Sequence, residues 1–185
     1  MTECRLLPCA TVGLALLVVS PVLATEDEHE EHGAHEHGAA VLNVVLEGNR
    51  LHLELETPAI NIVGFEHRPT DGAQEQIVED AAATLADGGK MFAFPLSADC
   101  FTFKVEVESA LLTGHDEKHK EDADEEDHSE FHVVYEFTCS GNEVQYIDVG
   151  LFSLFPGTEE IEARVVTPSG QTSRKVTPDS IRINL

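Results

Sequence analysis

The chain has 185 residues, of which 42% are hydrophobic and 25% are charged, and it contains no tryptophan. This composition predicts one globular domain with tails, large enough to bury a core. The 35 acidic residues outnumber the 11 basic ones, and the formal net charge of −24 argues against nucleic acid and anionic lipid as partners, because like charges repel. The same charge raises the local concentration of cations.

The first 24 residues have the pattern of a secretory signal peptide. Arg5 provides a weak positive n-region, residues 12–19 are mostly apolar, and residues 22–24 resemble a cleavage site. The apolar run is short for a transmembrane helix, although an uncleaved anchor is the alternative. We expect cleavage before residue 25 and no membrane insertion afterwards. Residues 25–38 carry no hydrophobic periodicity, which predicts a disordered segment rich in His and Glu.

From residue 39 onward the pattern becomes that of a β-rich domain, which we place at residues 39–185. One clear helix is predicted at 71–87, capped by Asp71 or Thr70 and stopped by two glycines at 88 and 89. Residues 61–65 are typical of an extended or turn segment, and 151–155 of a single helical turn. Alternation of apolar and polar residues predicts strands at 41–46, 50–57, 100–110, 131–139, 143–149, 160–167, 172–177 and 180–185.

The predicted fold class is therefore α+β, a single domain that is mainly antiparallel β with one α-helix. The first two strands are expected to form a hairpin, and the strands at 100–110 and 131–139 to pair across an acidic, His-rich loop at 113–129. The N-terminal segment and this loop, both rich in His and acidic residues, are the parts of the chain that we predict to be disordered.

Two cysteines remain after the predicted cleavage, because Cys4 and Cys9 belong to the signal peptide. In an exported protein, Cys100 and Cys139 are most simply a disulfide. The bond would close a loop of about 40 residues, worth roughly 4 kcal/mol in the chain-entropy model. A metal site that uses the two cysteines as thiolates is the alternative.

The histidines are concentrated in two acidic tracts. Imidazole is the commonest ligand for borderline divalent metals, and carboxylates add charge and donor oxygens. Two residues apart in an extended chain, His35 and His37 point to the same side and can reach one ion. The tracts therefore predict metal capture, and solvated charged segments are the alternative. The first tract contains His29, His32, His35 and His37, and the second is bracketed by His115, His119, His128 and His132.

Two further histidines lie outside the tracts. His67 follows Glu66 between a predicted strand and the helix, a position where a histidine is more often structural. His52 falls on the polar face of the strand at 50–57, where it is expected to be plain surface. The residues around His67 nevertheless belong to a larger pattern.

Several segments carry a family resemblance: HEHGAAVLNV at 35–44, ETPAINIVGFEHRP at 56–69, the two cysteines around a His- and acid-rich loop, and LFSLFPGTEEI at 151–161. With these segments the chain resembles the ZrgA-like family of bacterial periplasmic proteins linked to zinc uptake. The resemblance implies an exported protein of a Gram-negative periplasm that binds zinc and supports a high-affinity zinc importer. It also strengthens His35, His37 and His67 as candidate ligands.

We therefore predict a zinc site near the fold, built from His35, His37 and His67 and completed by Glu66 or His132. The other tract histidines would collect zinc weakly; they are His29, His32, His115, His119 and His128. Binding of nickel or copper(II) is one alternative, since both accept imidazole. A zinc-dependent hydrolase is a second, but the sequence contains no H-E-x-x-H helix or nucleophile elbow, and we expect no enzymatic activity. A structural adaptor whose acidic tracts contact a partner is a third.

Overall fold

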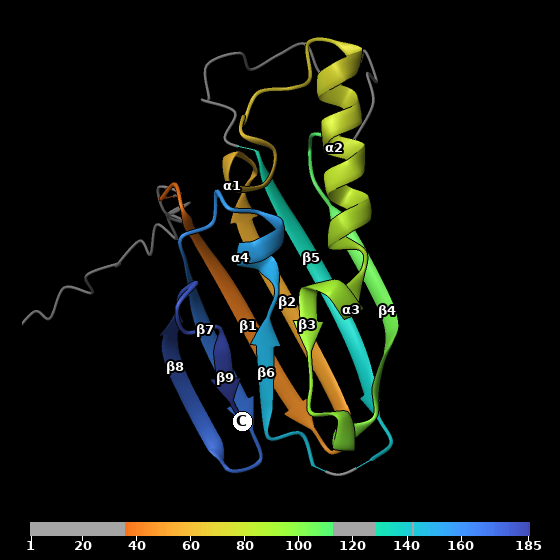
Figure 1. Ribbon diagram of the computed structural model, residues 1–185, viewed down its shortest axis with the longest axis vertical. Helices are drawn as coiled ribbons and strands as arrows, with labels where there is room; N and C mark the ends of the chain where they lie inside the picture. Colours follow the sequence, from red (N-terminus) through yellow and green to blue (C-terminus); the bar gives the residue numbers. More distant parts are fainter. Residues whose placement is uncertain (1–35, 113–128, 142) are drawn as a thin grey trace, which may run out of the picture. The chain divides into compact units, whose positions relative to one another are not determined.

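The computed structural model describes residues 36–112, 129–141 and 143–185. By proximity of its Cα atoms the chain divides into Met1–His32 and Gly33–Leu185, and every described residue belongs to the second unit. The predicted signal peptide, nearly all of the segment 25–38 and most of the loop 113–129 therefore lie outside the described residues. Figure 1 shows the described part as two sheets with one longer helix, α2 (Gly72–Leu85), and several short ones.

Six strands form the main sheet in the order β4-β5-β2-β1-β7-β8. All neighbours are antiparallel except β1 and β7, which are parallel because the chain crosses over through a second layer before it enters β7. The mainly antiparallel arrangement confirms the predicted fold class. The strands of this sheet are β1 (Ala39–Glu47), β2 (Arg50–Pro58), β4 (Cys100–Glu108), β5 (Glu130–Cys139), β7 (Glu160–Thr167) and β8 (Gly170–Val176).

The predicted hairpin is confirmed by the pairing of β1 with β2. Its turn contains Gly48 at a φ of +61°, a backbone conformation that favours glycine. The alternation is also as predicted: Leu51, Leu53 and Leu55 are fully buried, whereas the residues between them face the other side of the sheet. We call the side that carries His52, Glu54, Glu56, His132 and Glu136 the outer face.

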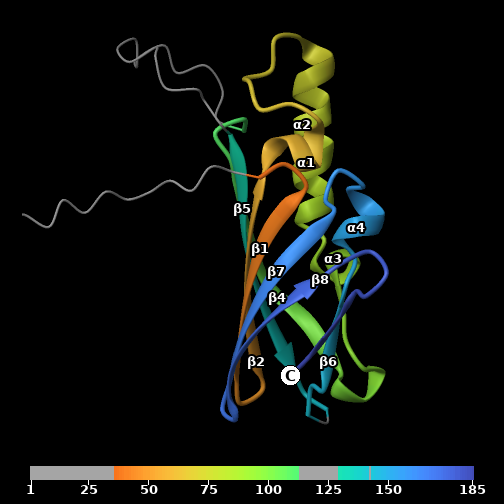
Figure 2. The ribbon, with the colours of Figure 1, turned by 90° about the vertical axis from the view of Figure 1, so that its left-hand side faces the viewer.

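A second layer covers the opposite, apolar face of the main sheet (Figures 1 and 2). It contains a three-stranded sheet in the order β3-β6-β9, made of Phe92–Ala93, Tyr146–Val149 and Arg182–Asn184, together with the helices. The ring of Phe92 on β3 meets Tyr135 on β5 edge to face at 5.0 Å. Tyr135 also donates a hydrogen bond to the carbonyl of Leu85 at 2.9 Å, and its burial raises the pKa of its hydroxyl. These contacts join the helical layer to the sheet through the core.

The main helix, α2, spans Gly72–Leu85 and is shorter than predicted. Of the two predicted caps, Asp71 is the one used, and its carboxylate accepts hydrogen bonds from two backbone amides of the first turn. The glycines at 88 and 89 do not end α2 but begin the next short helix, α3 (Gly88–Met91), which Asp87 caps. A 3-10 turn, η1 (Leu96–Ala98), then leads to β4, and α4 (Leu151–Leu154) is the helical turn predicted near 151–155.

The prediction of an extended or turn segment at 61–65 is wrong for its first half, because a short helix, α1, spans Ala59–Val63. Pro58 precedes the helix with a φ of −53°, which suits a helix start, and Gly64 ends it in the left-handed conformation. Five residues are too few for a helical period to be visible in the sequence. The helix is important below because it carries Asn61.

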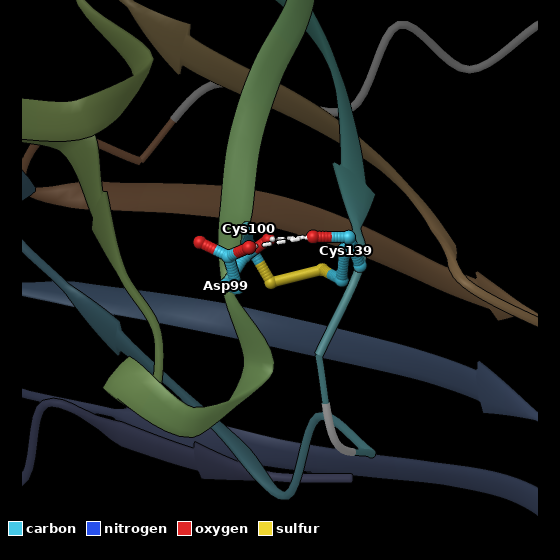
Figure 3. Close-up of a disulfide and its surroundings, with 4 residues drawn as sticks. Asp99, Cys100 and Cys139 are labelled. Carbon is cyan, nitrogen blue, oxygen red and sulfur yellow. Dashed lines mark hydrogen bonds between the residues drawn. A yellow bond between two sulfur atoms is a disulfide. The ribbon is translucent and has the colours of Figure 1, made fainter.

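The predicted disulfide is confirmed. Cys100 on β4 and Cys139 on β5 are directly opposite each other and are bonded (Figure 3). Beside the bond, the hydroxyl of Ser140 donates a hydrogen bond to the carboxylate of Asp99 at 2.6 Å. The disulfide thus fastens β4, an edge strand of the main sheet, to β5 at the end away from the loop that connects them.

Candidate metal-binding sites

A buried asparagine fixes the point at which the N-terminal tract enters the domain. Asn61 on α1 is only 4% exposed. Its side-chain oxygen accepts a hydrogen bond from the Gly38 amide at 2.7 Å, and its nitrogen donates to the Ala39 carbonyl at 2.9 Å and to the hydroxyl of Thr57 at 3.2 Å. A buried amide satisfied in this way ties the start of β1 to α1.

Gly38 is held from a second direction as well. Its carbonyl accepts hydrogen bonds from the backbone amides of Glu159 and Glu160, at 2.7 and 3.0 Å. Its φ of +85° favours glycine, and a Cβ atom at this position would approach the side chain of Glu159 to 3.2 Å. The backbone of Gly38 is therefore fixed on the domain, and so is the point at which His37, the preceding residue, is attached.

His37 lies beside Glu66, the acidic residue of the predicted site. The distance from His37 Nε2 to Glu66 Oε1 is 3.6 Å, and the histidine is mostly exposed whereas the glutamate side chain is 15% exposed. Two ligand atoms of a tetrahedral zinc site are about 3.3 Å apart when each bond is about 2.0 Å long. The pair therefore has nearly the separation that a shared zinc ion requires. We call His37, Gly38, Asn61 and Glu66 the N-terminal junction.

His67 follows Glu66 directly and is exposed. Its ring stacks on Phe65 with 5.0 Å between the centroids, and its Nδ1 lies 2.9 Å from the carbonyl of Arg68. A carbonyl oxygen accepts hydrogen bonds, so Nδ1 donates here; in the neutral imidazole the other ring nitrogen, Nε2, is then unprotonated and can bind a metal. The contacts described for His67 are with its own loop.

His132 lies in a different place from the N-terminal junction. It is on the outer face of β5, as its position between the buried Phe131 and Val133 predicts. Its Nε2 donates a hydrogen bond to Glu54 on β2 at 2.8 Å, and this hydrogen bond lowers the pKa of Glu54 below its usual value of 4.5. Of the two residues predicted to complete the zinc site, Glu66 is the one that lies beside His37.

Sequence reasoning did not single out the acidic residues around His132. In the sequence, Glu54 and Glu56 lie on the polar face of the strand at 50–57, and Glu108 lies in the strand at 100–110. The pairing of β5 with β4 was predicted, but alternation along the strands does not indicate that β2 is the other neighbour of β5.

Six of the predicted ligands lie outside the described residues, and their roles remain predictions. They are His29, His32, His35, His115, His119 and His128. The described chain begins at Glu36, one residue after His35. The second tract joins the described chain at Leu112 and Ser129, near the ends of β4 and β5.

The contacts between histidines and carboxylates fit a metal-binding domain, and a comparison with protein families agrees. Residues 34–185 match the model described as ZrgA family zinc uptake protein, so the chain belongs to this family and has a role related to zinc uptake. No sequence among the curated proteins matches the chain. Among the described helices, none is both long enough and apolar enough to cross a membrane.

Proposed function

We propose that the protein captures zinc in the periplasm and supports its uptake by a high-affinity importer. The observation that carries the proposal is the N-terminal junction, where a histidine of the first tract stands 3.6 Å from the carboxylate of Glu66. Membership of a zinc uptake family supports zinc as the cargo. The Cys100–Cys139 disulfide supports a compartment outside the reducing cytoplasm.

In this proposal His37 and Glu66 are the first two ligands of the capture site. The remaining positions of a zinc tetrahedron are assigned to His35, which precedes His37 by two residues, and to Nε2 of His67. The hydrogen bonds of Asn61 and Gly38 hold one end of the tract before metal arrives. Less conformational freedom is then lost on binding than for a wholly unconstrained segment, so the junction should bind more tightly than the rest of the tract.

The proposed role is binding and delivery without catalysis. Capture should depend on pH, because protons compete with zinc for imidazole, whose ordinary pKa is about 6.5. Calorimetric titration with zinc at about pH 7.5 and at about pH 5.5 tests this competition. We expect clearly weaker binding at the lower pH. Equal affinity at both values would rule out a site dominated by histidine.

Two variants connect the titration with the junction. His37→Ala and Glu66→Gln should each weaken the tightest zinc binding, roughly tenfold or more for the loss of a ligand. His52→Ala is the matched control, since His52 is an exposed histidine on β2 outside the junction. Repeating the titration with nickel and copper(II) decides among cargoes: tighter, specific binding of either ion in competition with zinc would replace zinc in the proposal.

A further inference from the structure

A second group of candidate ligands lies on the outer face of the main sheet, where β4, β5 and β2 are neighbours. His132 on β5 is directly opposite Glu56 on β2 and Glu108 on β4. Residues opposite each other in antiparallel strands point to the same face, and Glu54, two residues from Glu56, shares it. The strand register therefore gathers one imidazole and three carboxylates from three strands. We call these four residues the outer-face cluster.

Three residues of this cluster have ligand atoms close enough to share one ion. One ligand atom each from Glu54, Glu56 and His132 lie within 4.8 Å of one another. The hydrogen-bonded pair, His132 Nε2 and Glu54 Oε1, is at 2.8 Å, and the other ring nitrogen of His132 is 3.9 Å from Glu108 Oε2. Ligand atoms around zinc are about 3.3 Å apart, which lies between the separations observed here, and the side chains of Glu56 and Glu108 are exposed and have room to adjust.

The charges of the cluster also favour a cation. Three carboxylates on adjacent strands repel one another, and His132 stands among them. Arg164 is a cation that acts on Glu56, but its guanidinium makes two hydrogen bonds to Glu162, at 2.9 and 3.1 Å. The side chains of His132 and Glu54 are about one-third exposed, at 31% and 33%, which leaves them accessible to an ion from solvent.

We propose that His132, Glu54 and Glu56 form a second divalent-metal site, separate from the N-terminal junction, with Glu108 facing the second ring nitrogen of His132. The bound ion would take the place of the proton between His132 Nε2 and Glu54. A donor set of one imidazole nitrogen and carboxylate oxygens suits zinc and other borderline or hard divalent ions rather than copper(I), which prefers sulfur. This proposal depends on the proposed function in one respect only, namely that zinc is the ion that is bound.

The place of this site in the chain gives it a role. β4 and β5 are the two strands that the second His- and acid-rich tract connects, and Glu108 is the last residue of β4. A metal ion at the outer-face cluster is therefore bound at the base of that tract. Ions gathered there would have a site on the domain itself, just as ions gathered by the first tract have the junction.

The test compares charge-matched double variants by equilibrium dialysis against zinc. Glu54→Gln with Glu56→Gln removes two carboxylates of the cluster while preserving side-chain shape. Glu106→Gln with Glu136→Gln removes two carboxylates from β4 and β5 on the same face, outside the three-ligand group. We expect the first double variant to bind one zinc ion fewer per chain than the unmodified protein, and the second to bind the same number. Binding of cobalt(II) should show the same difference in its visible absorption bands.

Four outcomes separate this proposal from the proposed function. If Glu54→Gln with Glu56→Gln binds as many zinc ions as the unmodified protein, with unchanged affinity, the second site is wrong while zinc capture stands. If both double variants lose zinc equally, the effect is general electrostatic attraction and the site is again wrong. If His37→Ala leaves the outer-face ion in place and His132→Ala removes it, the two sites are independent. Absence of zinc binding in the unmodified protein overturns the proposed function itself.

Discussion

The N-terminal junction and the outer-face cluster bring a histidine to a carboxylate in two different ways. At the junction, a buried asparagine and a glycine with positive φ hold the backbone, and a single exposed histidine immediately precedes the glycine. In the outer-face cluster, no buried polar side chain is needed, because the register of three strands places the ligands. One site depends on a few specific hydrogen bonds, and the other on the sheet as a whole.

This difference has a consequence for how robust each site should be. A backbone clamp is lost when one side chain is truncated, whereas a strand register persists until the strands separate. The junction should therefore be sensitive to point substitutions in α1, and the cluster to changes that loosen the edge of the sheet. The following changes test this comparison.

The largest effect is expected from removal of the disulfide. Replacing Cys100 and Cys139 with alanine should lower the free energy of unfolding by about 4 kcal/mol, because the bond closes a loop between residues 39 positions apart. Urea unfolding measures the loss. Hydrogen exchange should rise most along β4, which pairs with β5 at the edge of the sheet, and little at β1. An equal increase in the rate of hydrogen exchange at the junction and along β4 would contradict the view that the disulfide mainly stabilises β4, the edge strand that carries Glu108.

A smaller loss of stability, about 3 kcal/mol, is expected for Asn61→Ala. The substitution removes the side chain that is hydrogen-bonded to the Gly38 amide, the Ala39 carbonyl and the Thr57 hydroxyl. Zinc binding at the junction should weaken while the outer-face ion remains. Thermal unfolding and zinc dialysis measure the two effects. Asn49→Ala, which alters an exposed asparagine in the β1–β2 turn, is the control. Loss of both ions to the same extent would show that the sites are not independent.

The smallest effect is expected for Asp148→Asn, which lies in the three-stranded sheet outside both regions. Hydrogen bonds from Arg182, at 2.7 Å, hold the pKa of Asp148 below its usual value of 3.8. Because the pKa of Asp148 is lowered in the folded state, its ionised carboxylate stabilises the protein above pH 3.8. This stabilisation is lost as the pH falls below 3.8 and the carboxylate becomes protonated. The variant should therefore be slightly less stable at neutral pH and equal at low pH, as urea unfolding can show. A change in zinc-dependent stabilisation would contradict the placement of metal binding in the two regions.

Several properties of the protein follow from the sequence alone, because they depend on neighbouring residues. Alternation along residues 50–57 and 131–139 establishes which side chains are buried and that His132 faces outward. The disulfide was predicted because Cys100 and Cys139 are the two cysteines outside the predicted signal peptide, and the start of α2 follows from the capping ability of Asp71. The prediction of the Asn61 segment failed because a five-residue helix has too little periodicity to detect.

The pairings of β1 with β2 and of β4 with β5 were predicted from the sequence, but only the tertiary structure decided how these pairs are ordered in the main sheet. Alternation assigns a side chain to one face of a strand, but it contains no information about lateral order in the sheet, which depends on packing across the whole core. The parallel contact of β1 with β7 and the contact of β2 with β5 both arise from that packing. As a result, the ligand atoms of His132, Glu54 and Glu56 lie within 4.8 Å of one another. Along the chain, His132 is more than 70 positions from the two glutamates. The two tracts of histidines and Glu66 as a candidate ligand could be read directly from the sequence. The choice of Glu66 over His132 as the neighbour of His37, and the carboxylates that face His132, required the fold.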